Sequence, residues 1–280
     1  MNIQSAINQG AQILKNKFFL NPYLDSEILM SKVINKDRKY LLLNARKRIE
    51  EKNLDLFKKL INERSKGKPI SYLTNKKSFW NSEFYITEDT LIPRPDSELI
   101  VENALNLTKN KNNLSILDIG VGSGCILLSI LQQRKDFYGT GLDVSKNCLK
   151  ITYKNAINLN IHSRLKLFNS NVDKFAFGKY DLIVSNPPYI KKHILKYLDK
   201  GVAKFEPKIA LDGGLDGLSE IRKVIKKSSE LIKKNGKFIL EIGFDQKNKV
   251  FNLLKKKGFY INSISKDLAK NDRCIVSTKI

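Results

Sequence analysis

Residues Leu114 to Gly124 read LSILDIGVGSG, and the type of fold follows from these eleven residues. The first six are mostly apolar, which predicts a buried strand over 114–119. Glycines at 120, 122 and 124 come next, and a helical pattern then continues through Leu131. Because glycine permits positive φ and a close approach of the backbone, a strand, a glycine turn and a helix in this order indicate a loop that holds a ligand.

Strand and helix patterns alternate from this loop to the C-terminus. The last stretch, 259–279, indicates two strands close in sequence, so at least one edge pair should be antiparallel. We therefore expect an α/β fold with a doubly wound, mostly parallel seven-stranded sheet. The other predicted strands are 137–142, 164–168, 181–185 and 237–242, and the helices after the first lie near 146–159, 217–234 and 246–257.

The glycine loop has the form G-x-G-x-G and not the G-x-G-x-x-G of dinucleotide-binding folds, because position 125 is Cys125. It resembles the nucleoside-binding loop of S-adenosylmethionine-dependent methyltransferases, which implies S-adenosylmethionine as the cofactor. Asp143 ends the next strand, where its carboxylate can accept hydrogen bonds from both ribose hydroxyls. The expected cofactor-binding residues here are Asp118, Gly120, Val121, Gly122, Ser123, Gly124 and Asp143.

Asn171 and Val172 follow the third predicted strand. Methyltransferases of this kind usually have an acidic residue at the first position and often an aromatic residue at the second. The Asn171 carbonyl can accept one hydrogen bond from the adenine amino group, and Val172 can offer an apolar surface to the base. We include both residues in the expected cofactor site.

The fourth strand ends at Ser185-Asn186-Pro187-Pro188-Tyr189. Each proline keeps the residue before it out of the helical region and has no N–H, so the loop is extended, rich in acceptors and poor in donors. A planar NH2 group suits such a loop, although Asn-Pro-Pro can also simply terminate a strand. We expect Asn186, Pro187 and Tyr189 to act in catalysis, Asn186 also to contact the cofactor, and Pro188 and Arg94 to join them in binding the substrate.

The N-terminal third indicates a separate domain. Helical stripes such as Ile3, Ile7 and Leu14 predict three to five short helices over 1–75. Two short strands around a polar turn predict a hairpin linker over 76–92. The catalytic domain is expected over 93–280, opening with the run IPRPDSE at 92–98, whose prolines hold Arg94 extended.

The composition limits the classes of function. The formal net charge is +23, which reflects either a lysine-rich coding bias or attraction to a polyanion such as nucleic acid. No apolar run approaches the length of a membrane span, so we expect a cytoplasmic protein. Three scattered cysteines and two isolated histidines suggest neither a disulfide framework nor a metal site, and we expect no metal.

Motifs spread over nearly the whole chain resemble the HemK-type release factor glutamine methyltransferases. The most specific part is the pairing of the IPRPDSE run with Asn186-Pro187-Pro188-Tyr189, because that tetrapeptide alone also occurs in DNA adenine methyltransferases. The resemblance implies methyl transfer to the side-chain amide of the glutamine in the Gly-Gly-Gln loop of class I peptide-chain release factors, in support of translation termination. It also implies that the helical domain over 1–75 takes part in substrate recognition. Further matching residues are Arg64, Gly67, Pro69, Tyr72, Phe79, Phe205-Glu206-Pro207, Gly213 to Leu218, Leu240 to Gly243 and Asp267 to Arg273.

Two alternatives remain open at this stage. A DNA or RNA adenine-amino methyltransferase would use the basic charge, but it would have to flip its base, and no target-recognition insertion separates the core elements. A non-catalytic module on ribosomal RNA would keep the fold, but Asp118, the glycines and Asn186 are all present. No membrane partner is expected, and no nucleic acid is required.

Overall fold

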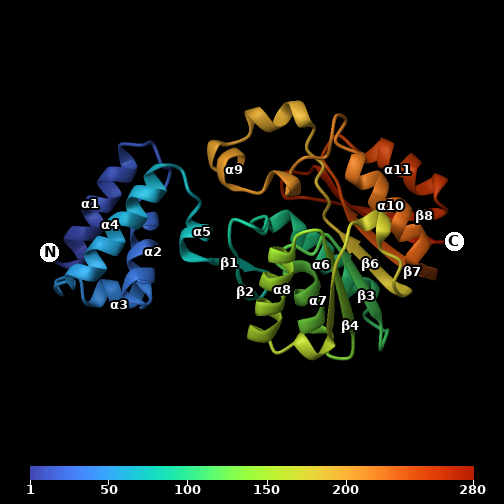
Figure 1. Cartoon of the computed structure of the whole chain (residues 1–280), viewed down its shortest axis with the longest axis horizontal. Helices are drawn as coiled ribbons and strands as arrows, with labels where there is room; N and C mark the ends of the chain where they lie inside the picture. The colour runs from blue at the N-terminus through green and yellow to red at the C-terminus, as the bar shows by residue number, and fades with distance from the viewer. The chain divides into compact units, whose positions relative to one another are not determined.

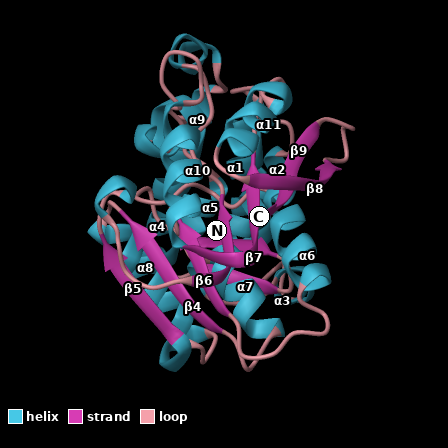
Figure 2. Ribbon diagram, turned by 90° about the vertical axis from the view of Figure 1, so that its right-hand side faces the viewer, coloured by secondary structure: helices cyan, strands magenta, loops and turns pink.

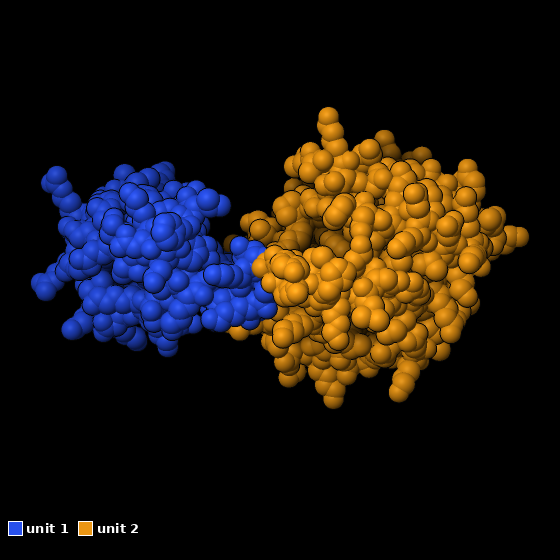
Figure 3. Space-filling model, turned by 90° about the horizontal axis from the view of Figure 1, so that it is seen from above, with its two compact units in different colours: residues 1–76, 199–205 blue, residues 77–198, 206–280 orange.

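The computed structural model describes all residues from 1 to 280, and the chain divides into two compact units. Unit 1 comprises residues 1–76 and 199–205, and unit 2 comprises residues 77–198 and 206–280 (Figure 3). A short helix far along the chain, α9 (Lys200–Phe205), therefore joins the N-terminal helices in unit 1. None of the helices is both long and apolar enough to cross a lipid bilayer.

Unit 1 is built from short helices whose starts are set by local sequence. Asn2 accepts a hydrogen bond from the Ser5 N–H and begins the first helix, Pro22 stands at the first position of the second, and Asp37 accepts from the Tyr40 N–H to begin the third. Their apolar faces enclose one core. The helices are α1 (Ile3–Lys15), α2 (Pro22–Ile34), α3 (Arg38–Leu43), α4 (Glu51–Ser65) and α5 (Ile70–Thr74).

Unit 2 is organised around a seven-stranded sheet, which confirms the predicted fold class (Figures 1 and 2). The strand order is β5-β4-β3-β6-β7-β9-β8, and pairs from β5 to β7 are parallel, whereas β9 runs antiparallel to both of its neighbours. The strands are β3 (Ser115–Ile119), β4 (Tyr138–Asp143), β5 (Leu165–Asn169), β6 (Tyr180–Ser185), β7 (Ile232–Glu241), β8 (Phe259–Lys266) and β9 (Asp272–Lys279).

Helices cover both faces of this sheet. On one face α6 (Glu98–Leu107), α7 (Cys125–Gln133) and α8 (Lys146–Asn158) lie side by side, and on the other α10 (Ser219–Leu231) packs beside α11 (Lys247–Lys256). A separate two-stranded sheet, β1 (Lys76–Phe79) with β2 (Ser82–Tyr85), precedes these elements. The three-layer arrangement buries both faces of the parallel strands, which explains their nearly continuous apolar sequences.

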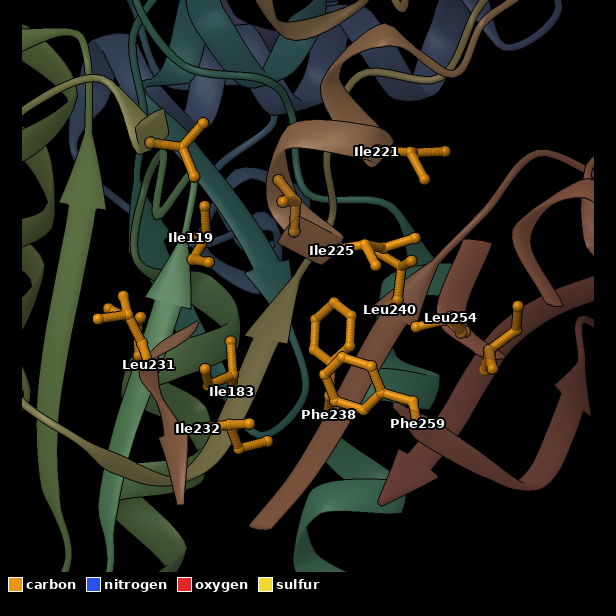
Figure 4. Close-up of a cluster of buried hydrophobic side chains, with 14 of the residues drawn as sticks. Ile119, Ile183, Ile221, Ile225, Leu231, Ile232, Phe238, Leu240, Leu254 and Phe259 are labelled. Atoms are coloured by element: carbon orange, nitrogen blue, oxygen red, sulfur yellow. The ribbon is translucent and has the colours of Figure 1, made fainter. Parts of the chain in front are cut away.

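One hydrophobic core of unit 2 lies between the sheet and α10 and α11. Figure 4 shows Ile183 of β6 and Phe238 of β7 in this layer, with Phe259 of β8 beside Phe238. The two phenyl rings are tilted, with centroids 5.5 Å apart. Burying rings of this size contributes about 2–3 kcal/mol each, so this layer holds the strand ends in fixed positions.

The predicted boundary between the helix near 217–234 and the strand after it differs from the structure. The sequence predicts a helix near 217–234 and a strand from 237, but α10 ends at Leu231 and β7 begins at Ile232. Ile232 pairs with Tyr180 and is 5% exposed, whereas the lysines after it are exposed. Burial of Ile232 in the sheet therefore outweighs the helical pattern of the preceding residues.

Candidate functional site

The two predicted loops leave neighbouring strands at the same edge of the sheet. Strand β3 lies between β4 and β6, and Asp118 of β3 pairs with Val184 of β6. The buried Ser185 hydroxyl donates a hydrogen bond to the Ile119 carbonyl at 2.7 Å, which ties the two strand ends together. The strand order reverses here, and in doubly wound sheets such a switch point is where ligands bind.

The glycine loop requires glycine for two different reasons. Gly120 has φ of 82°, and a Cβ on it would meet no atom within 4 Å, so conformation alone demands glycine there. Gly124 also has φ of 82°, and a Cβ on it would lie 2.8 Å from Cγ2 of Thr152. The loop is thus packed against α8 on one side and open on the other.

Hydrogen bonds hold this loop in place. Asp143 accepts from the Gly122 N–H through Oδ2 and from the Ser145 N–H through Oδ1, each at 2.9 Å. From α8, Thr152 donates to the Gly122 carbonyl and Asn155 to the Ser123 carbonyl, again at 2.9 Å. The loop is consequently fixed before any ligand arrives.

Asp118 is a buried carboxylate without a partner. It is 1% exposed, and neither of its oxygens has a hydrogen-bond partner. Burial raises the pKa of Asp118 to about 8, and the negative charge of Asp143 acts in the same direction. Burial also raises the pKa of Asp143, while hydrogen bonds from Ser145 and Gly122 oppose this. A cationic ligand would relieve both carboxylates.

A cavity of about 840 Å³ opens beside the two loops, within the size range of small-molecule sites. Its lining includes most of the predicted site residues but not Asp118, Gly124 or Tyr189. The predicted residues that line it are Arg94, Gly120, Val121, Gly122, Ser123, Asp143, Asn171, Val172, Asn186, Pro187 and Pro188.

The side-chain oxygen Oδ1 of Asn171 already accepts a hydrogen bond from the Asp173 N–H at 3.0 Å. This bond caps the short 3-10 helix η3 (Val172–Lys174) and leaves that oxygen one further lone pair. Val172 is 8% exposed, belongs to the core and shows part of its side chain to the cavity. Both residues therefore have a structural task besides any contact with a base.

A row of hydrogen bonds holds the Asn186 side chain in place. Its Nδ2 donates to Ser97 Oγ at 2.9 Å, Ser97 donates to Glu241 Oε2 at 2.6 Å, and the Tyr189 hydroxyl donates to Glu241 Oε1 at 3.2 Å. Glu241 at the end of β7 is far from the tetrapeptide in sequence but contacts Tyr189 in space. Ser97 and Glu241 both lie in motifs that match the family, the IPRPDSE run and Leu240 to Gly243, but the sequence did not indicate what either residue does.

Arg94 lines the cavity and is also anchored. Its Nη2 forms an ion pair with Glu206 Oε1 at 2.5 Å, and the other Glu206 oxygen accepts from the Ile92 N–H at 3.2 Å. The Glu206 side chain is only 1% exposed. This pair fixes the IPRPDSE run against the segment that precedes Pro207, another residue of the cavity lining.

These features fit the expected cofactor. S-adenosylmethionine carries an amino group and a sulfonium, both positive. Two carboxyl groups flank the glycine loop in sequence or contact it, the buried and unpartnered Asp118 and the half-buried Asp143, which lines the cavity. The open side of the glycine loop leaves room for a ligand against the backbone at Gly120.

Two family models match the chain, the PrmC N-terminal domain over residues 5–74 and the methyltransferase small domain over 96–200. The release factor glutamine methyltransferase of Clostridium acetobutylicum is 35% identical, over 100% of this chain and 99% of that protein. The chain belongs to the release factor glutamine methyltransferase family. As a family member it is an S-adenosylmethionine-dependent methyltransferase.

Two further relatives are also similar to this chain. The release factor glutamine methyltransferase of Buchnera aphidicola is 36% identical over 100% of this chain and 99% of that protein. A protein of Rickettsia bellii named bifunctional methyltransferase is 32% identical over 98% of this chain, which covers 54% of that longer protein.

Solved structures show the fold of this family member. A methyltransferase from Pyrococcus furiosus has a TM-score of 0.54 at 19% identity, covering 72% of this chain and 91% of that one. A ribosomal protein L11 methylase from Lactobacillus delbrueckii has a TM-score of 0.51 at 16% identity, covering 70% and 84%. At such identities the likeness concerns the architecture alone.

Proposed function

We propose that this protein transfers a methyl group from S-adenosylmethionine to the side-chain amide nitrogen of the glutamine in the Gly-Gly-Gln loop of class I peptide-chain release factors. The observation that carries the proposal is the placement of Asn186 and Pro187 in the same cavity as the glycine loop, at adjacent strand ends. Membership of the family supports a release factor as the substrate.

The acceptor nitrogen would be held by two oxygens. Asn186 Oδ1 and the Pro187 carbonyl can each accept one N–H of a planar amide, which aims the nitrogen lone pair at the methyl group. When bound, the cofactor supplies an electrophilic methyl on a sulfonium. The amide nitrogen would form a bond to this methyl carbon, with the sulfur leaving as a thioether, and would then release its extra proton to water.

The cofactor would be held by the glycine loop and the two carboxylates. Asp143 is suited to the ribose hydroxyls, because it ends β4 next to the loop. Asp118 offers a buried carboxyl group whose ionised form a cationic group would stabilise. Asn171 and Val172 line the same cavity and would face the adenine.

We assign recognition of the release factor in part to the helical N-terminal domain, proposed over residues 1–75, with 76–92 as a linker and 93–280 as the catalytic domain. Unit 1 exposes large apolar side chains on the turn after α1, with Phe18 94% and Leu20 96% exposed. Phe18 also has φ of 61°, a region that a bulky residue rarely adopts. Such residues suit contact with a protein partner.

The test incubates the purified protein and labelled S-adenosylmethionine with a class I release factor, with its Gln-to-Ala loop variant, and with DNA. Label should enter the release factor that has the intact glutamine, and neither the loop variant nor DNA. Label in DNA would favour the adenine-amino methyltransferase alternative. Equal label in the loop variant would place the methyl group elsewhere on the factor.

A further inference from the structure

Three polar side chains from distant parts of the sequence meet behind Asn186. Ser97 ends the 3-10 helix η1 (Pro95–Ser97), Glu241 ends β7, and Tyr189 closes the tetrapeptide. Ser97 is 3% exposed and Glu241 is 1% exposed. Buried polar groups of this kind are retained only where hydrogen bonds satisfy them.

In the row of hydrogen bonds from Asn186 through Ser97 to Glu241, the chemistry of each side chain determines which group donates and which accepts. A serine hydroxyl has one proton, and an ionised carboxylate can only accept. Because Ser97 Oγ lies 2.6 Å from Glu241 Oε2, its proton points at the carboxylate. The lone pairs of Ser97 must then accept, and the group that faces them at 2.9 Å is Asn186 Nδ2.

This donor–acceptor direction determines which side-chain atom Asn186 can offer to a ligand. With Nδ2 bonded to Ser97, the remaining polar atom of this cavity-lining side chain is Oδ1, an acceptor. A flipped amide would present two N–H donors instead. Two such donors facing the NH2 of an acceptor substrate would repel it.

We propose that Ser97 and Glu241 are positioning residues that lock the Asn186 amide with its oxygen toward the acceptor nitrogen. The inference rests on the proposed function, because it concerns how the same site selects an NH2 group. Tyr189 completes the arrangement by donating to the second carboxylate oxygen, which leaves Glu241 with a donor on each side.

The lock depends on Glu241 being ionised. Burial raises the pKa of Glu241 to about 7, while hydrogen bonds from Ser97 and Tyr189 and the positive charge of Arg273 oppose this. A protonated Glu241 can donate to Ser97, which lets the Asn186 amide flip. The charged or titratable groups that face Glu241 are Tyr189, Arg273, Asp96, Cys274 and Cys125.

The first test measures methyl transfer to a release factor for Ser97→Ala, Ser97→Thr and, as a matched control, Ser228→Ala, which removes a buried hydroxyl that has no partner. We expect kcat to fall about 10- to 100-fold in S97A, since small misplacements of a reacting group cost on this order. S97T should recover most of the rate, and S228A should match wild type. An S97A enzyme with unchanged kcat would overturn the proposal.

The second test is the pH profile of Glu241→Gln. In wild type kcat should decline as the pH falls below about 7, and this acid limb should disappear in E241Q, because an amide does not titrate there. The rate of E241Q should be lower than that of wild type at pH 8, since its amide permits both polarities. If both proteins show the same decline at low pH, a group other than Glu241 causes that decline, and the proposed role of Glu241 ionisation is wrong.

A third measurement does not depend on any substrate. With 15N-labelled asparagine, the Asn186 NH2 protons should exchange slowly with water in wild type and S97T and faster in S97A. If wild type methylates no release factor, the proposed function fails but this experiment still decides the lock. Equal exchange in wild type and S97A would refute the lock even if methylation is observed.

Discussion

Asp143 accepts a hydrogen bond from the Gly122 N–H at 2.9 Å, so the carboxylate at the end of β4 and the glycine loop after β3 form one unit. The same carboxylate takes the Ser145 N–H through its other oxygen. A ligand that bonds to Asp143 therefore meets a carboxylate whose direction is fixed by two backbone amides. Such preorganisation reduces the entropy lost on binding.

Replacing Asp143 by Asn should weaken S-adenosylmethionine binding about 10- to 100-fold, because one oxygen becomes a donor and the negative charge is lost. Calorimetric titration of the variant with the cofactor measures the change. Asp136→Asn, which alters an aspartate that accepts from the Asn113 N–H, should bind the cofactor like wild type. Equal affinities of D143N and wild type would remove Asp143 from the cofactor site.

Asp118 should make the ligand-free protein less stable as the pH rises. Its folded-state pKa of about 8 exceeds the ordinary value of 3.8, so its stabilising contribution is complete below about pH 4 and is lost as the pH rises through 8. Asp118→Asn should gain about 2 kcal/mol relative to wild type between pH 6 and 8. Urea unfolding at both pH values tests this, and parallel pH dependence in the two proteins would contradict it.

The Arg94–Glu206 pair should stabilise the fold as a coupled unit. Arg94→Ala would leave the buried Glu206 carboxylate with only the Ile92 N–H, at a cost of about 1–3 kcal/mol. Adding Glu206→Gln to R94A should recover part of this loss, since no buried charge remains. Thermal unfolding of the two single variants and the double variant gives the coupling energy, and strict additivity would argue against the pair.

Phe18 and Leu20 should affect recognition of the release factor and not the chemistry. Ala at both positions should raise KM for the factor several-fold with kcat unchanged, because the lost contacts act equally before and during the reaction. Leu268→Ala is the matched control, since Leu268 is an equally exposed leucine of unit 2. A similar rise of KM in L268A, or no rise in the double variant, would contradict the assignment of Phe18 and Leu20 to release-factor recognition.

Much of the fold and of the site could be predicted because the signals are local. The glycines at 120, 122 and 124, the carboxylate of Asp143 and the tetrapeptide at Asn186 each stand directly after an apolar strand, where a doubly wound sheet brings loops together. Ser97 and Glu241 could not be assigned roles. They lie 89 and 55 positions from Asn186, and no spacing rule relates a helix start to the end of a fifth strand.

The sequence also cannot show which way a side-chain amide is turned. Asn186 could be identified as an acceptor of an NH2 group, but only its contact with Ser97 shows which of its atoms turns toward the cavity. Tyr189 was expected to act in catalysis and to bind the substrate, and the structure adds that its hydroxyl donates a hydrogen bond to Glu241. Packing among distant elements decides such details.

The central claim is that Asn186 orients the acceptor nitrogen, and Asn186→Ala tests it most directly. Single-turnover methyl transfer to a release factor and the Kd for S-adenosylmethionine are measured on the same preparation, with the exposed Asn262→Ala as the control. We expect the rate to fall by about 10²–10³, as for the loss of one preorganised group, while the Kd changes by no more than about threefold. A parallel loss of rate and cofactor affinity would show that Asn186 mainly holds the cofactor and would contradict the account.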